Sequence, residues 1–106
     1  MSRKGLLFTH LRLKLNKQVD FEFDPQKSQS NKLKHGIDFE EAKALWNDPN
    51  AIEIELQYPD EKRRARIGKQ LEGSTELWTA IFTLRAEKVR LISVRRVRTK
   101  EKQQYG

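Results

Sequence analysis

The residues best suited to chemistry are arginines in segments whose alternating pattern predicts β-strands: Arg63, Arg64, Arg66, Arg85, Arg90, Arg95 and Arg96. A guanidinium on a rigid strand can bind a phosphate through two hydrogen bonds. It can also stabilise the negative charge that develops in a phosphoryl transition state. For any single arginine, a structural ion pair is the competing interpretation. The set therefore indicates phosphate chemistry and leaves open which members take part.

The sequence lacks the residues that several other kinds of active site require. The chain has no cysteine, and its two histidines are His10 and His35, which excludes disulfides, thiolate zinc sites, cysteine nucleophiles and a histidine metal cage. No glycine-rich phosphate loop or nucleophile elbow is present. We therefore expect no cofactor and no metal site.

No apolar run approaches the roughly 20 residues that a membrane span needs. The longest one near the N-terminus covers residues 5–8, which is too short for a secretory signal. We expect a soluble, cytoplasmic domain with no membrane partner.

Charge is distributed unevenly along this chain of net charge +7. Residues 1–19 carry five basic and no acidic side chains, residues 20–61 carry four and eleven, and residues 85–106 carry eight and two. A basic excess of this size favours a polyanionic partner, most often nucleic acid. On composition alone, a domain with a solvated basic face is an equal alternative.

Two side chains, His35 and Glu61, are candidates for proton transfer. His35 precedes Gly36 at a predicted helix end, where histidine commonly interacts with the helix dipole, although acid–base work or phosphate contact is the alternative. Glu61 is interpreted either as a solvated turn residue or, because it is close in sequence to Arg63, as a proton acceptor. Lys27 and Lys34 share one helical face with an asparagine, which forms a polar stripe.

The N-terminal half predicts a short strand followed by two helices. Residues 21–23 alternate phenylalanine with glutamate, as a half-buried strand does. Asp24, an N-cap residue followed by proline, and Gly36 predict a helix between them. The only apolar residue of that helix is Leu33, although a packed helix normally has an apolar stripe. A capping box starts the second helix at Asp38, and Pro49 stops it.

The C-terminal half predicts four strands, over residues 52–56, 63–67, 76–84 and 88–97, followed by a helical turn capped by Thr99. The resulting order is β-α-α-β-β-β-β-α. We predict an α+β domain in which two N-terminal helices pack on one face of a small antiparallel sheet, with a short C-terminal helix.

Alternation along the strands assigns the arginines to faces. Arg63 shares its face with the apolar residues of segment 63–67, which predicts a core edge or a cleft, and Arg64 lies on the opposite face. Strict alternation in the last strand places Arg95 with Leu91 and Arg96 with Val94. A charge among core residues is costly unless it lies at a strand end or in a cleft with a partner.

Several separated blocks resemble the BrnT-like toxins of type II toxin–antitoxin systems. The first block reads Phe21-x-Phe23-Asp24-x-x-Lys27-x-x-x-Asn31-x-x-Lys34-His35-Gly36, and Phe39-Glu40-Glu41-Ala42 follows. The distal blocks are Arg63-x-x-x-Ile67-Gly68, Thr83-x-Arg85, Arg90-Leu91-Ile92-Ser93-Val94-Arg95-Arg96, Glu101 and Tyr105. The resemblance covers about residues 19–105. We expect a single domain over 19–106 and a basic extension over 1–18.

The resemblance implies a RelE-like fold and a ribonuclease that halts growth. It also implies a BrnA-like antitoxin with a ribbon-helix-helix part, so that the complex binds operator DNA. The sequence departs from the family pattern at two positions. Phe23 stands where the family usually has tryptophan, and Ala86 stands where it often has a turn glycine. Neither departure removes a charged candidate.

The residues and the resemblance lead to one catalytic hypothesis. In RNA cleavage without a metal, the 2′-hydroxyl attacks the adjacent phosphorus, and the protein holds the strand, neutralises charge and moves protons. Phosphate binding is assigned to Arg63, Arg85 and Arg95, and flanking contacts to Lys27, Lys34, Arg64 and Arg96. Proton transfer is assigned to Glu61 or His35. The alternatives are a non-catalytic nucleic-acid-binding module and a decayed toxin.

Overall fold

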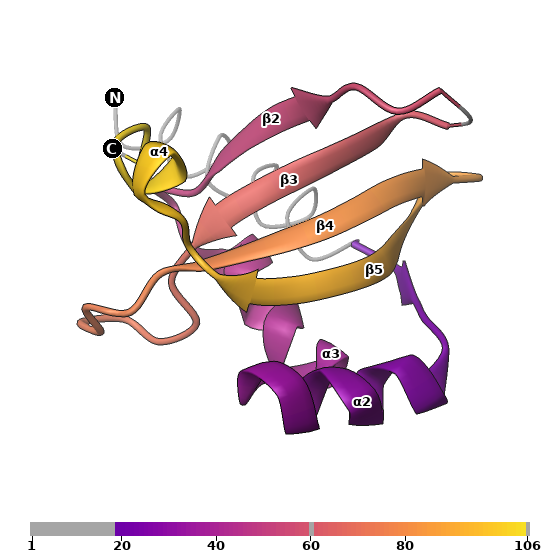
Figure 1. Ribbon diagram of the computed structural model, residues 1–106, viewed down its shortest axis with the longest axis horizontal. Coiled ribbons are helices and arrows are strands. Elements are labelled where there is room, and N and C mark those ends of the chain that lie inside the picture. Colours follow the sequence, from indigo (N-terminus) through magenta and orange to yellow (C-terminus); the bar gives the residue numbers. More distant parts are fainter. Residues whose placement is uncertain (1–18, 60, 106) are drawn as a thin grey trace, which may run out of the picture.

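The computed structural model describes residues 19–59 and 61–105 (Figure 1). The predicted basic extension lies outside the described residues. The elements are β1 (Phe21–Glu22), α2 (Pro25–His35), α3 (Phe39–Ala42), the 3₁₀ helix η1 (Lys43–Asn47), β2 (Ile52–Leu56), β3 (Arg63–Gly68), β4 (Trp78–Arg85), β5 (Lys88–Arg96) and α4 (Thr99–Lys102). This order confirms the predicted α+β class. None of these helices is long and apolar enough to cross a membrane.

The five strands form one sheet in the order β1-β5-β4-β3-β2. Neighbours from β2 to β5 are antiparallel, whereas β1 runs parallel to β5. The sheet is therefore mixed, and the prediction of a wholly antiparallel sheet was wrong at this edge. The long path from β1 to β5, through all the intervening elements, leaves their relative direction free of the constraint that a tight hairpin imposes.

The main core lies between one sheet face and the helices α2, α3 and η1, which lie below the sheet in Figure 1. Buried apolar side chains from both layers meet there: Ile37, Phe39, Ala42, Leu45, Trp78, Ala80, Phe82, Val89, Leu91 and Val94. Phe23 packs its ring edge-on against Phe39 at 5.5 Å. Phe23 therefore makes an aromatic contact at the core edge.

Helix α2 is held by polar contacts, which explains its lack of an apolar stripe. The Asn31 side-chain amide is buried and donates to the carbonyl oxygens of Ile37 and Val94, both at 2.8 Å. Its oxygen accepts from the Val94 backbone N–H at 3.2 Å. Ser28 Oγ accepts from the Phe39 N–H at 2.8 Å. Leu33 is 89% exposed and contributes nothing to the core.

The second predicted helix is present in two parts. Its capping box is confirmed, since the side chains of Asp38 and Glu41 each accept from the other's backbone N–H. After α3 the backbone tightens into η1, and Arg66 Nε donates to the Leu45 carbonyl at 3.0 Å. At the C-terminal end, the N-cap of α4 is Arg98, so the predicted cap, Thr99, is instead its first helical residue.

A β-bulge between β4 and β5 changes the predicted faces of the last strand. Ile81 pairs with Ser93 and Phe82 with Leu91, so Ile92 is the extra residue. Strict alternation ends there, and Leu91 and Val94 both belong to the helix-covered core. The prediction that Arg95 shares a face with Leu91 was therefore wrong. Arg95 pairs with Thr79, whose side chain contacts α4.

Candidate functional site

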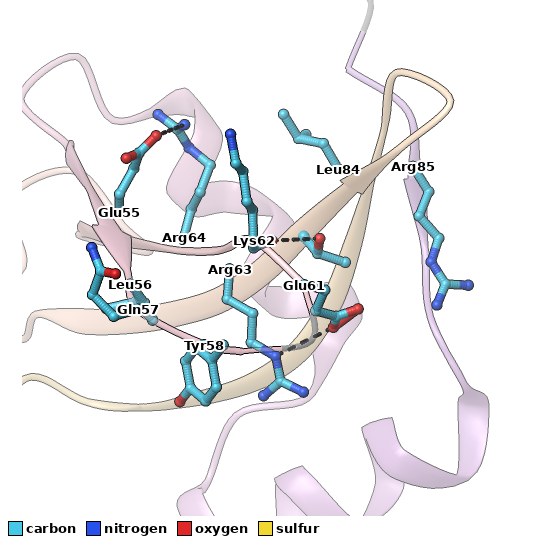
Figure 2. A pocket seen from close by; sticks show the side chains of 11 residues that line it. Glu55, Leu56, Gln57, Tyr58, Glu61, Lys62, Arg63, Arg64, Leu84 and Arg85 are labelled. Carbon is cyan, nitrogen blue, oxygen red and sulfur yellow. Dashed lines mark hydrogen bonds and ion pairs between the residues drawn. The ribbon is translucent and has the colours of Figure 1, made fainter.

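A cleft of about 530 Å³ opens where the β2–β3 connection meets the end of β4 (Figure 2). Four cations and two carboxylates line it together with polar and apolar side chains. The lining residues are Glu55, Leu56, Gln57, Tyr58, Glu61, Lys62, Arg63, Arg64, Thr83, Leu84 and Arg85. The excess of cations makes this cleft attractive to an anion.

Arg63 is held in the cleft by a carboxylate and an aromatic ring. Its Nε donates to Glu61 Oε2 at 3.3 Å, and its Cζ lies 4.5 Å from the centre of the Tyr58 ring. Its two Nη atoms form no hydrogen bond with any described residue. The guanidinium is thus held by a carboxylate and an aromatic ring while its terminal nitrogens remain able to bind a phosphate.

The end of β4 places a second arginine in the lining of the same cleft. Thr83 Oγ1 donates to the Lys62 carbonyl at 2.7 Å and so ties the start of β3 to β4. Arg85 lies two residues after Thr83, on the same strand face. Figure 2 shows Arg63 and Arg85 extending to one side of β4, and Lys62 and Arg64 to the other. Lys62 and Arg85 form no ion pair within the described part of the chain.

The turn after Arg85 is unusual in composition. Ala86 and Glu87 both have positive φ, 47° and 69°, and form the two-residue connection from β4 to β5. Such turns favour asparagine and glycine, and a side chain in this region costs roughly 1 kcal/mol or more per residue. The side chains of Ala86 and Glu87 therefore introduce backbone strain next to a cleft arginine.

Arg64 lines the cleft, but carboxylates of β2 already engage it. Its guanidinium lies 3.3 Å from Glu53 Oε1 and 3.6 Å from Glu55 Oε2. Glu53 also accepts from Arg66 Nη1 at 2.8 Å. These contacts form a cross-strand ladder, so Arg64 is less available to a ligand than Arg85.

Arg95 lies outside the cleft, at the other end of the sheet. Its Nη1 and Nη2 donate to the two oxygens of Glu101 at 2.9 and 2.8 Å. Thr79 Oγ1 and the Arg98 N–H also donate to Glu101. The bidentate Arg95 contact, helped by these hydrogen bonds, lowers the pKa of Glu101 to about 2 against the opposing effect of burial. Arg95 therefore anchors α4.

The remaining candidates are not gathered at the cleft. Lys27, Lys34 and His35 are exposed on α2, which covers the opposite face of the sheet, and none of them lines the cleft. Arg96 lies at the far end of β5, 2.9 Å from Glu76 Oε2 and 5.0 Å from the centre of the Trp78 ring. Of the nine predicted site residues, the cleft brings together Glu61, Arg63, Arg64 and Arg85.

Among the cleft residues that sequence reasoning missed are Tyr58 and Lys62. Both lie in the connection between β2 and β3, and the Tyr58 ring lies against Arg63. The available signal was the hairpin itself, because pairing of segments 52–56 and 63–67 places the intervening residues around the first arginine. Among the described residues, no group of three histidines or carboxylates is arranged to hold a metal ion.

Comparison with known families agrees with the motif blocks. Residues 23–101 match the family described as the ribonuclease toxin BrnT of type II toxin–antitoxin systems. Comparison with curated proteins gives no match. The match covers most of the chain, including every strand from β2 to β5 and all four cleft candidates. The chain therefore belongs to the BrnT family of ribonuclease toxins.

Proposed function

We propose that this protein cleaves RNA at the cleft beside β3 and β4 and does so without a metal ion. The observation that carries the proposal is the pair of arginines with open donors on one side of the cleft. The Nη atoms of Arg63 are free of described partners, and Arg85 has no ion pair there. A phosphodiester bound between them would receive several charge-assisted hydrogen bonds.

The proposed reaction is transfer within the RNA strand. The 2′-oxygen forms a bond to phosphorus while the bond from phosphorus to the 5′-oxygen of the next nucleotide breaks. Glu61 accepts the proton of the 2′-hydroxyl, and the leaving oxygen takes a proton from water. The hydroxide that remains takes up the proton held by Glu61, which restores the carboxylate. Arg63 and Arg85 stabilise the charge that grows on the phosphorus oxygens. The products carry a 2′,3′-cyclic phosphate and a 5′-hydroxyl.

The other predicted residues have smaller parts in this proposal. Lys62 and Arg64 extend the basic lining and would contact flanking phosphates. Lys27, Lys34 and Arg96 lie away from the cleft, so their expected contribution is general attraction of the RNA. We assign no proton transfer to His35, which lies outside the cleft. Arg95 would have to release Glu101 before it could bind a phosphate.

The test is incubation of the purified full chain with single-stranded RNA in the presence of a metal chelator. We expect cleavage with cyclic phosphate ends, and loss of most of it in Glu61→Gln. Cleavage abolished by the chelator would contradict metal independence. RNA that is bound in a salt-dependent manner but never cleaved would favour a non-catalytic binding module.

We also propose that a BrnA-like ribbon-helix-helix antitoxin neutralises the toxin in the cytoplasm and that the complex binds operator DNA. The basic cleft would be covered by an acidic segment of that partner. Co-purification of the two proteins should weaken as salt rises, and Arg85→Glu should weaken it further than Arg98→Glu, which changes a cation outside the cleft. Binding indifferent to salt and to both reversals would contradict this.

A further inference from the structure

We propose that Tyr58 forms a subsite for an unpaired nucleobase next to the phosphate held by Arg63. The proposal rests on the proposed function, because it deepens the same cleft. Tyr58 lines the cleft and is 48% exposed, so its ring is accessible to a ligand. A nucleobase is the part of an RNA ligand with a flat π-face that such a ring can stack on.

The geometry leaves one side of the Tyr58 ring for a ligand. Arg63 Cζ lies 4.5 Å from the ring centre, so the guanidinium takes up one surface of the ring. Figure 2 shows Tyr58 on the side of Arg63 that is away from Arg85. No hydrogen bond or aromatic contact from the rest of the described chain engages its other side.

This placement sets the class of RNA that fits. A phosphate on the open Nη atoms of Arg63 lies beside the ring, so an adjacent base can reach it. In a duplex that base is stacked and paired, and extruding it has a free-energy cost. The subsite therefore selects single-stranded RNA. It reads the presence of a base and not its identity, because every base has a stacking face.

A purely structural role for Tyr58 is the competing explanation. Its ring could act only by holding Arg63 through the cation–π contact. In that case removal of the ring would weaken phosphate binding whether or not a base is present. Base stacking and support of Arg63 can therefore be separated in a double-mutant cycle, in which the RNA base and the Tyr58 ring are removed singly and together.

The experiment measures binding of a short RNA that cannot be cleaved because its sugars are 2′-deoxy, with each base removed in turn. We expect Tyr58→Ala to weaken binding of the intact oligonucleotide about 5- to 100-fold, and Tyr58→Phe to bind like wild type. We expect that loss to shrink to near zero when one particular base is missing. Leu71→Ala, which truncates a 67% exposed side chain outside the cleft, should change nothing.

A second readout follows stacking directly. 2-Aminopurine at the same position should lose fluorescence on binding to wild type and Tyr58→Phe, and keep it with Tyr58→Ala. An equal loss of affinity for intact and abasic oligonucleotides in Tyr58→Ala would overturn the subsite and leave the proposed cleavage site standing. No binding to wild type at all would overturn both proposals.

Discussion

The two ends of one sheet face carry arginines of the same type in opposite states. At the cleft end, Arg63 touches its carboxylate only through Nε, at 3.3 Å, and both Nη atoms are free of described partners. At the other end, Arg95 places both Nη atoms on Glu101. Its side chain is 18% exposed, against 31% for Arg63.

The difference shows that the way a carboxylate contacts an arginine decides which of its nitrogens stay free. A bidentate carboxylate occupies the donors with which a guanidinium would grip a phosphate. A carboxylate bound through Nε orients the guanidinium and leaves those donors available. Substitution of a cleft arginine should therefore lower activity, whereas substitution beside α4 should lower stability.

The largest expected effect is on activity at the cleft. Arg85→Ala should lower the rate of RNA cleavage by about 100-fold or more, because removal of a preorganised donor from a transition-state charge costs roughly 10²–10³ in rate. The free energy of unfolding should change by less than about 0.5 kcal/mol, since Arg85 is an exposed side chain. Arg98→Ala, a matched arginine outside the cleft, should leave cleavage unchanged. An equal loss of cleavage rate in Arg85→Ala and Arg98→Ala would contradict a special role of the cleft end.

The next largest effect is the loss of folding stability at low pH, which comes from Glu101 beside α4. The pKa of Glu101 is about 2 in the folded protein and near its ordinary value when unfolded. The folded state therefore binds fewer protons between these values, and its stability is full above about pH 4.5 and declines as the pH falls toward 2. Up to about 3 kcal/mol is lost from this group. Urea unfolding of wild type and Glu101→Gln across this range isolates the contribution, and identical acid slopes would contradict it.

At neutral pH, Glu101→Gln tests the ion pair between Arg95 and Glu101 by itself. Glu101→Gln should reduce the free energy of unfolding by about 2 kcal/mol, because Arg95 is left half-buried without its charge partner. RNA cleavage below the unfolding transition should stay within a few-fold of wild type. Loss of cleavage with full stability would assign Glu101 to the chemistry and contradict its structural role.

The smallest effect concerns the turn that carries Arg85. Ala86→Gly should raise the free energy of unfolding by up to about 1 kcal/mol, since glycine adopts φ of +47° without the side-chain penalty. For a domain of this size, that corresponds to about 4–8 °C in Tm. Ala44→Gly, a change at a residue of η1, should lower the Tm instead. A fall in Tm for both variants would show that the turn carries no strain.

The sequence predicted those parts of the fold that local signals specify. Asp24 and Gly36 set both ends of α2, and the alternation of β2 and β3 predicted both as strands. Asn31 was predicted as part of a polar stripe, because nothing local indicates that its amide bonds the backbone of a strand more than 60 residues away. The bulge at Ile92 likewise depends on packing between β4 and β5.

The site was predictable to the same extent. Arg63 and Arg85 followed from strand position and from the family blocks, and the cleft brings them together. The predicted hairpin of the last two strands already places Arg95 far from Arg85, because Arg95 lies several residues beyond the turn. The sequence did not show the bulge, which puts Arg95 on the same face as Arg63, or its bidentate contact with Glu101. The contact between Tyr58 and Arg63 arises from the β2–β3 connection, and the pairing of the two strands was its only signal in the sequence.

The most direct test of the difference between the two ends compares Arg63→Ala with Arg95→Ala in one set of measurements, RNA cleavage rate and Tm. We predict that Arg63→Ala loses about 100-fold or more in cleavage while its Tm stays close to that of wild type. Arg95→Ala should lose several degrees of Tm and retain cleavage at temperatures where it is folded. Loss of cleavage in a folded Arg95→Ala, with full cleavage in Arg63→Ala, would contradict the assignment of the cleft as the catalytic end.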